Sequence, residues 1–288
     1  MPPTSDLLTL RRSVLAACVL HDIDTTPGED GIVLDVGSRA VALSWDAVAE
    51  LAAPAAGDGE LVAALLARRL RALSRLDHPD RLQARLLALP AGHADHAGPD
   101  WVRARVPGGV LDMGLGLVLD ETDEPLPLPP VAVPSGLVPP ATVAGWWEQA
   151  LAHGTRMGAL LVERLRSGRP TVAGSSSGAV LRPYGGTDVL ALLSLRGVRE
   201  YLAREDGSGM RAVAAPARSR GWLDPSRVDP AFVAAAWTAT DPLARGVPVP
   251  LLVTADEVGA ARALGDVVAQ SLDQPRAWRA GPWGGPRR

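Results

Sequence analysis

The sequence predicts an α+β fold, with short antiparallel hairpins in the N-terminal half and helices dominating the C-terminal half. Two observations support this fold class. Residues 31–44 hold two apolar, β-branched runs around Gly37-Ser38, a pattern typical of a hairpin. Residues 60–76 and 142–167 repeat their apolar positions every three or four residues, which is typical of amphipathic helices.

The N-terminal half alternates between these two kinds of pattern. Residues 80–89 follow Pro79 and fit either a helix or a strand. Pro107-Gly108-Gly109 marks the turn of a second hairpin. The other expected elements are helices over 7–20, 46–53 and 60–76, the first hairpin over 31–44, and the strands of the second hairpin over 101–106 and 110–119.

In the C-terminal half the strongest helix covers 142–167, with Glu148, Arg156 and Glu163 opposite its apolar face. Asp229 and Pro230 suit the N-cap and first turn of a helix that ends near residue 240. The remaining expected elements are short strands at 179–181, 210–215 and 250–253, a helix from a Thr187 cap to Arg204, and a final helix over 255–272 capped by Thr254.

An acidic and then proline-rich segment, residues 120–140, separates the two halves. Such a composition favours an extended, semi-rigid and solvated chain. We therefore expect an N-terminal domain over 1–119, a linker over 120–140, a C-terminal domain over 141–272 and a disordered tail over 273–288. The alternative is that 120–140 forms a strap across a single domain.

The composition excludes several chemistries. All 29 basic residues are arginine, and both lysine and asparagine are absent, which indicates a GC-rich, bacterial genome. Without lysine there is no ordinary Walker A loop, no Schiff-base or pyridoxal-phosphate site, and no protein-kinase signature. The hydrophobic fraction of 47% and the formal net charge of −3 are those of a globular chain without a strong overall field.

The single cysteine, Cys18, excludes an internal disulfide and a cysteine-based zinc site. We expect a buried helix cysteine in a soluble cytoplasmic protein. The alternative is a lipoprotein cleavage box at Leu15–Cys18, but the apolar region after Arg12 is short for an export signal. No membrane span is expected, because prolines interrupt the longest uncharged run, 125–147.

Two short motifs carry reactive residues without their usual context. Gly174–Gly178 matches a nucleophile elbow around Ser176, but all five histidines lie upstream and no helix is expected after it. His93 and His96, with Asp95 and Asp100, are metal-type ligands on a glycine- and proline-flanked loop. We interpret both segments as loops and predict neither a metal site nor a cofactor.

The favoured ligand site lies before the helix expected to start at Thr187. Two glycines allow a ligand to approach the backbone, helix N-terminal amides favour an anion, and an arginine pairs with carboxylate or phosphate. The alternative is an ordinary turn that leads into a helix cap. In addition, the aspartate in this segment would repel an anion. The candidate ligand-binding residues are Arg182, Tyr184, Gly185, Gly186, Thr187 and Asp188.

Arginines cluster between residues 68 and 85, and acidic residues cluster between 112 and 124. The chain lacks interleaved aromatic residues there, so we expect an internal match or a solvated face rather than nucleic-acid binding. Two functions remain open. The first is a non-enzymatic protein acting through a protein partner or as a homo-oligomer, and the second is an enzyme or small-molecule binder that recognises an anion at 182–188.

Overall fold

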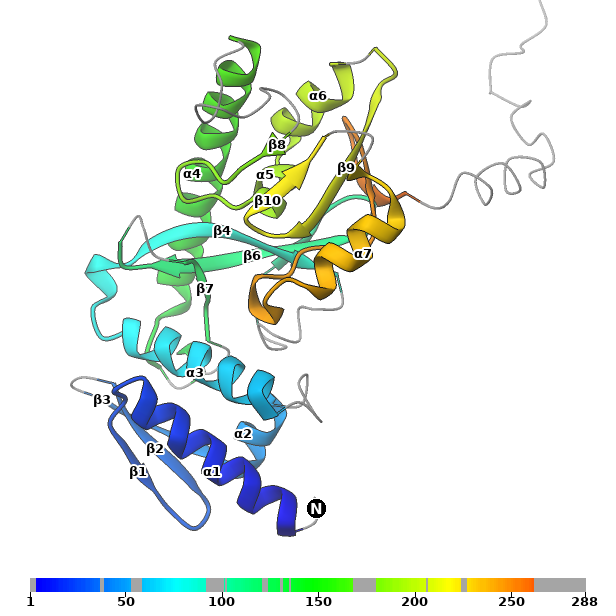
Figure 1. Cartoon of the computed structure of the whole chain (residues 1–288). Coiled ribbons are helices and arrows are strands. Elements are labelled where there is room, and N and C mark those ends of the chain that lie inside the picture. Colours follow the sequence, from blue (N-terminus) through cyan, green and yellow to red (C-terminus); the bar gives the residue numbers. More distant parts are fainter. Residues whose placement is uncertain are drawn as a thin grey trace, which may run out of the picture.

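The computed structural model describes residues 4–36, 39–52, 59–91, 101, 103–120, 124–129, 132–134, 136–167, 180–205, 207–223 and 227–261. These residues form helices and three antiparallel sheets, which confirms a mixed α+β fold (Figure 1). The helices are α1 (Thr4–Leu20), α2 (Trp45–Ala52), α3 (Gly59–Arg75), α4 (Pro140–Arg166), α5 (Val189–Ser194), α6 (Arg196–Arg204) and α7 (Pro230–Thr238), with short 3-10 turns η2 (Pro79–Arg81) and η6 (Pro242–Ala244). The strands are β1 (Thr25–Pro27), β2 (Gly31–Val36), β3 (Arg39–Ser44), β4 (Gln83–Pro90), β5 (Arg103–Arg105), β6 (Leu111–Val118), β7 (Leu126–Pro127), β8 (Val180–Leu181), β9 (Met210–Ala217), β10 (Arg220–Trp222), β11 (Leu251–Thr254) and β12 (Val258–Ala260).

The first layer is the meander β1–β2–β3 with helices α1, α2 and α3 (Figure 1). The expected hairpin is present, with Ile32 opposite Leu43 and Leu34 opposite Val41. These four side chains are buried on one face, because residues two apart on a strand share a face. The apolar face of α3 continues this core with Leu66, Leu70 and Leu73.

The central sheet is built on β6, which pairs with β4 along one edge and with β5 and then β7 along the other. Strand β4 is buried on both faces. Ala84, Leu86 and Ala88 join the main core on the side of α4, and Leu87 and Leu89 form a second cluster with Trp101 on the opposite side. Residues 83–90 are therefore a strand, which resolves the helix-or-strand ambiguity of the sequence.

The third sheet has the order β12-β11-β9-β10-β8 and lies in the C-terminal half. The helices α6 and α7 pack against this sheet, whereas α4 and α5 pack mainly against β4 and β6 of the central sheet (Figure 1). Because five strands share this half with those helices, the expectation that helices dominate it is not clearly shown.

The helix expected from Thr187 to Arg204 is divided. Asp188, not Thr187, is the N-cap: its carboxylate accepts from the Ala191 amide at 2.8 Å. Leu195 then adopts an extended conformation and ends α5 before α6 begins. Its side chain packs over Gly154 and Gly158 of α4, so a tertiary contact interrupts the helix.

The prediction of a helix from residue 255 is wrong for the residues that the structure describes. The Thr254 hydroxyl does accept from the Asp256 and Glu257 amides, as a helix cap would. The chain then returns as β12, because Val258 is fully buried and its amide donates to Pro107 O at 2.9 Å. Residues 262–288, including the expected tail, lie outside the described residues.

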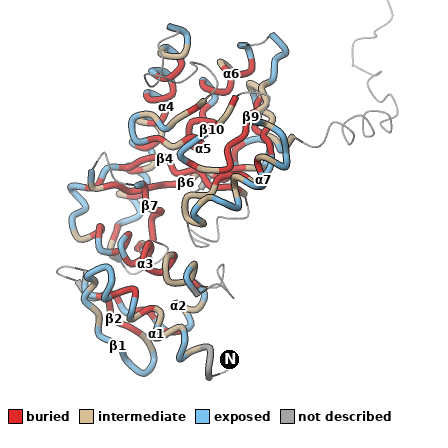
Figure 2. Tube along the Cα trace, viewed as in Figure 1, coloured by how far each residue is buried: buried red, intermediate tan, exposed pale blue. Residues whose placement is uncertain are grey.

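The segment expected to be a solvated linker is partly buried where the structure describes it. Leu126 and Leu128 are 1% and 3% exposed, and β7 extends the central sheet. Figure 2 shows buried chain running from the first layer through the central sheet into the third sheet. The division into domains at 1–119 and 141–272 stays a prediction.

Candidate ligand pocket

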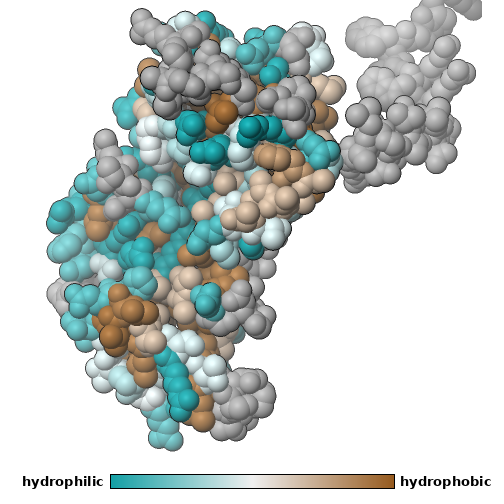
Figure 3. Space-filling view, viewed as in Figure 1, coloured by the Kyte–Doolittle hydropathy of each residue, from teal (hydrophilic) through white to brown (hydrophobic). Residues whose placement is uncertain are grey.

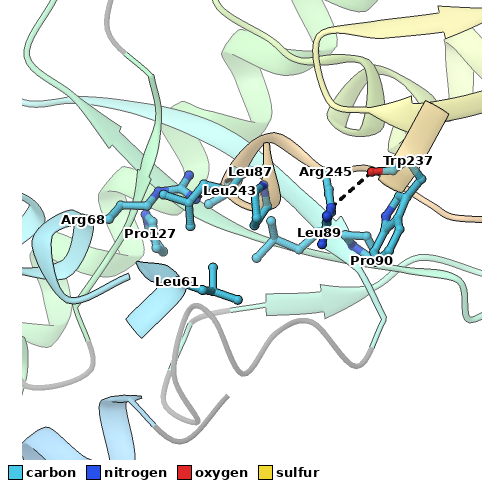
Figure 4. A pocket seen from close by; sticks show the side chains of 10 residues that line it. Leu61, Arg68, Leu87, Leu89, Pro90, Pro127, Trp237, Leu243 and Arg245 are labelled. Atoms are coloured by element: carbon cyan, nitrogen blue, oxygen red, sulfur yellow. Dashed lines mark hydrogen bonds between the residues drawn. The ribbon is translucent and has the colours of Figure 1, made fainter. Parts of the chain in front are cut away.

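A pocket of about 210 Å³ lies where α3, the central sheet and the α7–η6 segment meet (Figure 4). Helix α3 contributes Leu61 and Arg68. The walls of the pocket are mostly apolar, because the face of β4 that carries Leu87 and Leu89 points toward the pocket. The remaining lining residues are Leu87, Leu89, Pro90, Pro127, Trp237, Pro242, Leu243 and Arg245.

Arg68 is positioned in the pocket by bonds to two other elements. Its Nη2 donates to Glu124 Oε1 at 2.7 Å, and its Nη1 donates to the Leu243 carbonyl at 3.5 Å. Burial and the neighbouring Arg218 lower the pKa of Arg68 to about 10, an effect that Glu124 and Asp188 partly offset. The guanidinium is therefore positively charged at neutral pH.

Arg245 lines the pocket from the segment after α7. Its guanidinium stacks on Trp237 at 4.2 Å, and its Nε donates to the carbonyls of Trp237 and Thr240 at 3.2 and 3.1 Å. Its Nη2 donates to the Thr238 carbonyl at 3.3 Å. A cation at the carboxyl end of a helix is favourable there, and the stacking and these bonds fix the orientation of the guanidinium.

Arg182–Asp188, the predicted ligand loop, lies against α4. Tyr184 and Thr187 exchange main-chain hydrogen bonds, and the Gly185 carbonyl contacts His153 Nε2 at 2.8 Å. Both glycines have positive φ, as a tight turn requires. Two polar atoms, Arg182 Nε and Thr187 Oγ1, are buried without a hydrogen-bond partner among the described residues.

Asp188 in this loop already has a cationic partner. Arg218 donates to Asp188 Oδ2 through Nη2 at 2.7 Å and through Nε at 2.9 Å. Arg218 also reaches Glu124 Oε1 at 3.2 Å, and Glu124 binds Arg68. The predicted ligand loop and the pocket are therefore joined by the chain of ion pairs Asp188–Arg218–Glu124–Arg68, which we call the charge network.

Most of the arginine cluster expected to match the acidic segment or face solvent is buried. Arg68, Arg69, Arg75 and Arg85 are each less than 10% exposed. Arg75 donates to the Leu117 and Glu124 carbonyls at 3.0 and 3.1 Å. Arg68 thus pairs with the acidic segment through the Glu124 carboxylate, whereas these bonds of Arg75 go to main-chain carbonyls.

Several sequence candidates need no ligand or lie outside the described residues. Cys18 is buried in α1, and burial raises the pKa of its thiol. Ser176 and His93–Asp100 belong to the undescribed residues.

Within the described part of the chain, no three metal-binding side chains are grouped to hold an ion. The described helices include none that is both long and apolar enough to cross a bilayer.

Comparison with known proteins adds no family or relative. No protein-family model matches the chain, and no characterised protein or solved structure shows significant similarity to it.

The sequence did not predict the pocket, because the residues that line it are spread from Leu61 to Arg245. One signal was present in the sequence. Residues 86–89 form a short apolar run that, if it is a strand, places leucines on both faces, which is typical of a strand covered on both sides. Nothing in the sequence indicated which distant arginines would reach its second face.

Proposed function

We propose that this protein binds a small organic anion with an apolar body in the pocket between α3, the central sheet and α7–η6. The observation that carries the proposal is a cavity with apolar walls that holds two guanidinium groups from separate elements. Ligand pockets commonly combine apolar walls with a few fixed polar groups. Guanidinium groups select carboxylates and phosphates among the possible polar partners.

The size of the pocket limits the ligand. Drug-sized ligands occupy about 300–1,000 Å³, whereas an apolar cavity of about 150 Å³ holds one benzene ring. At about 210 Å³, this pocket has room for a six-membered ring or short chain together with an anionic group.

The pocket suits an anion better than the Arg182–Asp188 loop, which remains a predicted site. In the loop, Asp188 adds a negative charge and the Thr187 amide is bonded to the Tyr184 carbonyl. In the pocket, Arg68 is paired with Glu124, but Arg245 has no carboxylate partner among the described residues, since its donors reach main-chain carbonyls.

Calorimetric titration with matched probes tests this proposal. We expect benzoate and hexanoate to bind with a Kd of about 1 mM or tighter, and benzyl alcohol and hexanol to bind at least tenfold more weakly. Arg245→Gln should weaken benzoate binding about tenfold or more, because it removes the charged donor.

Arg196→Gln is the matched control, since Arg196 is an exposed arginine paired with Glu200 on α6. It should leave benzoate binding unchanged. Equal binding of benzoate and benzyl alcohol, or no binding of either anion, would overturn the proposal.

A second candidate function is contact with a protein partner, and one feature of α1 favours it. Leu8, Val19 and Leu20 of this helix are 53%, 81% and 80% exposed. Figure 3 shows a brown, apolar patch over the carboxyl end of α1. Exposed apolar surface of this kind often marks an interaction site.

Light scattering during size-exclusion chromatography tests self-association through this patch. If the patch joins two copies, Val19→Glu should convert the wild-type dimer to a monomer. Leu160→Glu, at an exposed leucine of α4, should leave the dimer intact. A wild-type monomer at 100 μM would exclude self-association through α1 as the function of this surface.

A further inference from the structure

The two arginines of the pocket have different bonding states. Arg245 is oriented by main-chain carbonyls and by Trp237, and it lacks a carboxylate partner among the described residues. Its positive charge is therefore not neutralised by any side chain that the structure describes, and it can attract an anionic group of a ligand without displacing one.

Arg68 has a carboxylate partner but an unused donor. Its side chain is 10% exposed, and its Nε is buried without any hydrogen-bond partner among the described residues. Nε and Nη2 lie on the same edge of a guanidinium, which binds a carboxylate through two parallel bonds. Here Nη2 donates to Glu124, whereas Nε has no acceptor in the part of the chain that the structure describes, so only one of the two donors on this edge is used.

An unpartnered buried donor is unfavourable. A buried polar group without a hydrogen bond costs about 1–3 kcal/mol, so such groups are uncommon in folded proteins. Arg68 Nε has almost no accessible surface, so the Arg68 side chain must turn toward the pocket for a ligand oxygen to accept from this donor. The Glu124 side chain is 52% exposed, so its carboxylate is free to adjust when a second oxygen arrives.

The two arginines lie at opposite ends of the pocket. Figure 4 shows Arg68 beside Pro127 at one end and Arg245 beside Trp237 at the other, with leucine side chains between them. A ligand with one anionic group fills one end only. A ligand with two anionic groups, separated by an apolar chain or ring, reaches both.

We propose that the ligand of this pocket is a two-ended anion, an aliphatic or aromatic dicarboxylate, with one carboxylate on Arg245 and the other accepting from Arg68 Nε. This inference rests on the proposed function, since it specifies the ligand class of the same pocket. The apolar segment between the carboxylates contacts Leu61, Leu87 and Leu89.

Titration of the wild-type protein with a chain-length series tests the inference without any mutation. The probes are the linear dicarboxylates from succinate to suberate, each beside the monocarboxylate of equal carbon number. We expect an optimum at one chain length, where the dicarboxylate binds at least tenfold more tightly than its monocarboxylate. Shorter and longer members should lose this advantage, because rigid walls fix the separation of the two arginines.

Arg68→Gln adds an independent measurement. It should remove the dicarboxylate advantage, lowering the affinity for the best dicarboxylate at least tenfold more than the affinity for the monocarboxylate of equal carbon number. Urea unfolding of the variant shows whether it folds, and the ligand series on wild-type protein stands if it does not.

The outcomes separate the two proposals. If monocarboxylates bind and dicarboxylates bind no more tightly at any length, the two-ended ligand is wrong while the anion-binding function remains. If neither series binds, the anion-binding function itself fails.

Discussion

At the scale of single residues, Asp188 shows how a predicted ligand residue becomes a structural one. Its Oδ1 caps α5 through the Ala191 amide, and its Oδ2 accepts two bonds from Arg218. Arg218 is 5% exposed, so the loss of Asp188 leaves a buried cation with Glu124 as its only carboxylate partner among the described residues.

Asp188→Ala should lower the free energy of unfolding by about 3 kcal/mol. This combines the loss of an N-cap with the disruption of a buried ion pair. Urea unfolding monitored by circular dichroism measures the change as a lower midpoint at unchanged m-value.

Asp229→Ala is the matched control for the cap alone. Asp229 accepts from the Ala231 and Phe232 amides at the start of α7 but has no ion pair among the described residues. Its replacement should cost about 1 kcal/mol. An Asp188→Ala variant no less stable than Asp229→Ala would show that the pair with Arg218 contributes nothing.

At the scale of elements, α4 and the central sheet depend on one glycine. A Cβ at Gly154 would overlap Leu86 Cδ1 of β4 and contact Leu195. Leu86 is 1% exposed, so its side chain has little room to move. Gly154 therefore allows α4 to approach β4 closely.

Gly154→Ala should lower the free energy of unfolding by about 1–2 kcal/mol, because the overlap outweighs the better helix propensity of alanine. Gly145→Ala in the same helix should raise it by about 0.5–1 kcal/mol, since a Cβ there meets nothing within 4 Å. Thermal unfolding of the two variants measures both changes. Stabilisation by both substitutions would contradict the packing of α4 on β4.

The elements best predicted from the sequence are those that local interactions define. The helix expected over 142–167 is α4, and the Asp229 cap with Pro230 begins α7 as expected. The hairpin over 31–44 is β2 and β3, with the turn itself outside the described residues. In each case the periodicity or the cap lies within the segment, so no distant residue is needed to specify it.

The elements that the sequence failed to predict depend on distant contacts. Leu195 interrupts the helix expected up to Arg204 because it packs on α4. Val258 belongs to a strand that pairs with β11 and is held by a bond from its amide to the Pro107 carbonyl, although Thr254 offers the cap of a helix. A local cap stabilises a turn by about 1 kcal/mol, which burial of a large apolar side chain exceeds.

At the scale of the whole molecule, the charge network joins parts that are far apart in the chain. Glu124 contacts Arg68 of α3 and Arg218 beyond β9, at 2.7 and 3.2 Å. Its own carbonyl accepts from Arg75. The segment expected to be a linker thus connects α3 to the C-terminal sheet.

Glu124→Ala should lower the Tm by about 2–6 °C. The expected loss is about 1–2 kcal/mol, less than for a fully buried pair because the carboxylate is 52% exposed and screened by water. Scanning calorimetry measures this change and also tests the predicted domains, since independently folding halves would give two transitions. Glu200→Ala, which breaks only the exposed pair with Arg196, should change the Tm by less than about 1 °C.

The sequence by itself determined the α+β class, most helix and strand positions, and the absence of lysine-dependent chemistry, because composition and periodicity are local properties of the chain. The tertiary structure alone decided where charge meets apolar surface. Arg68 and Arg245 lie 177 residues apart in the sequence, yet both line the same pocket, because α3 and the α7–η6 segment meet the second face of β4. Such a meeting depends on how whole layers pack, and no local pattern specifies it.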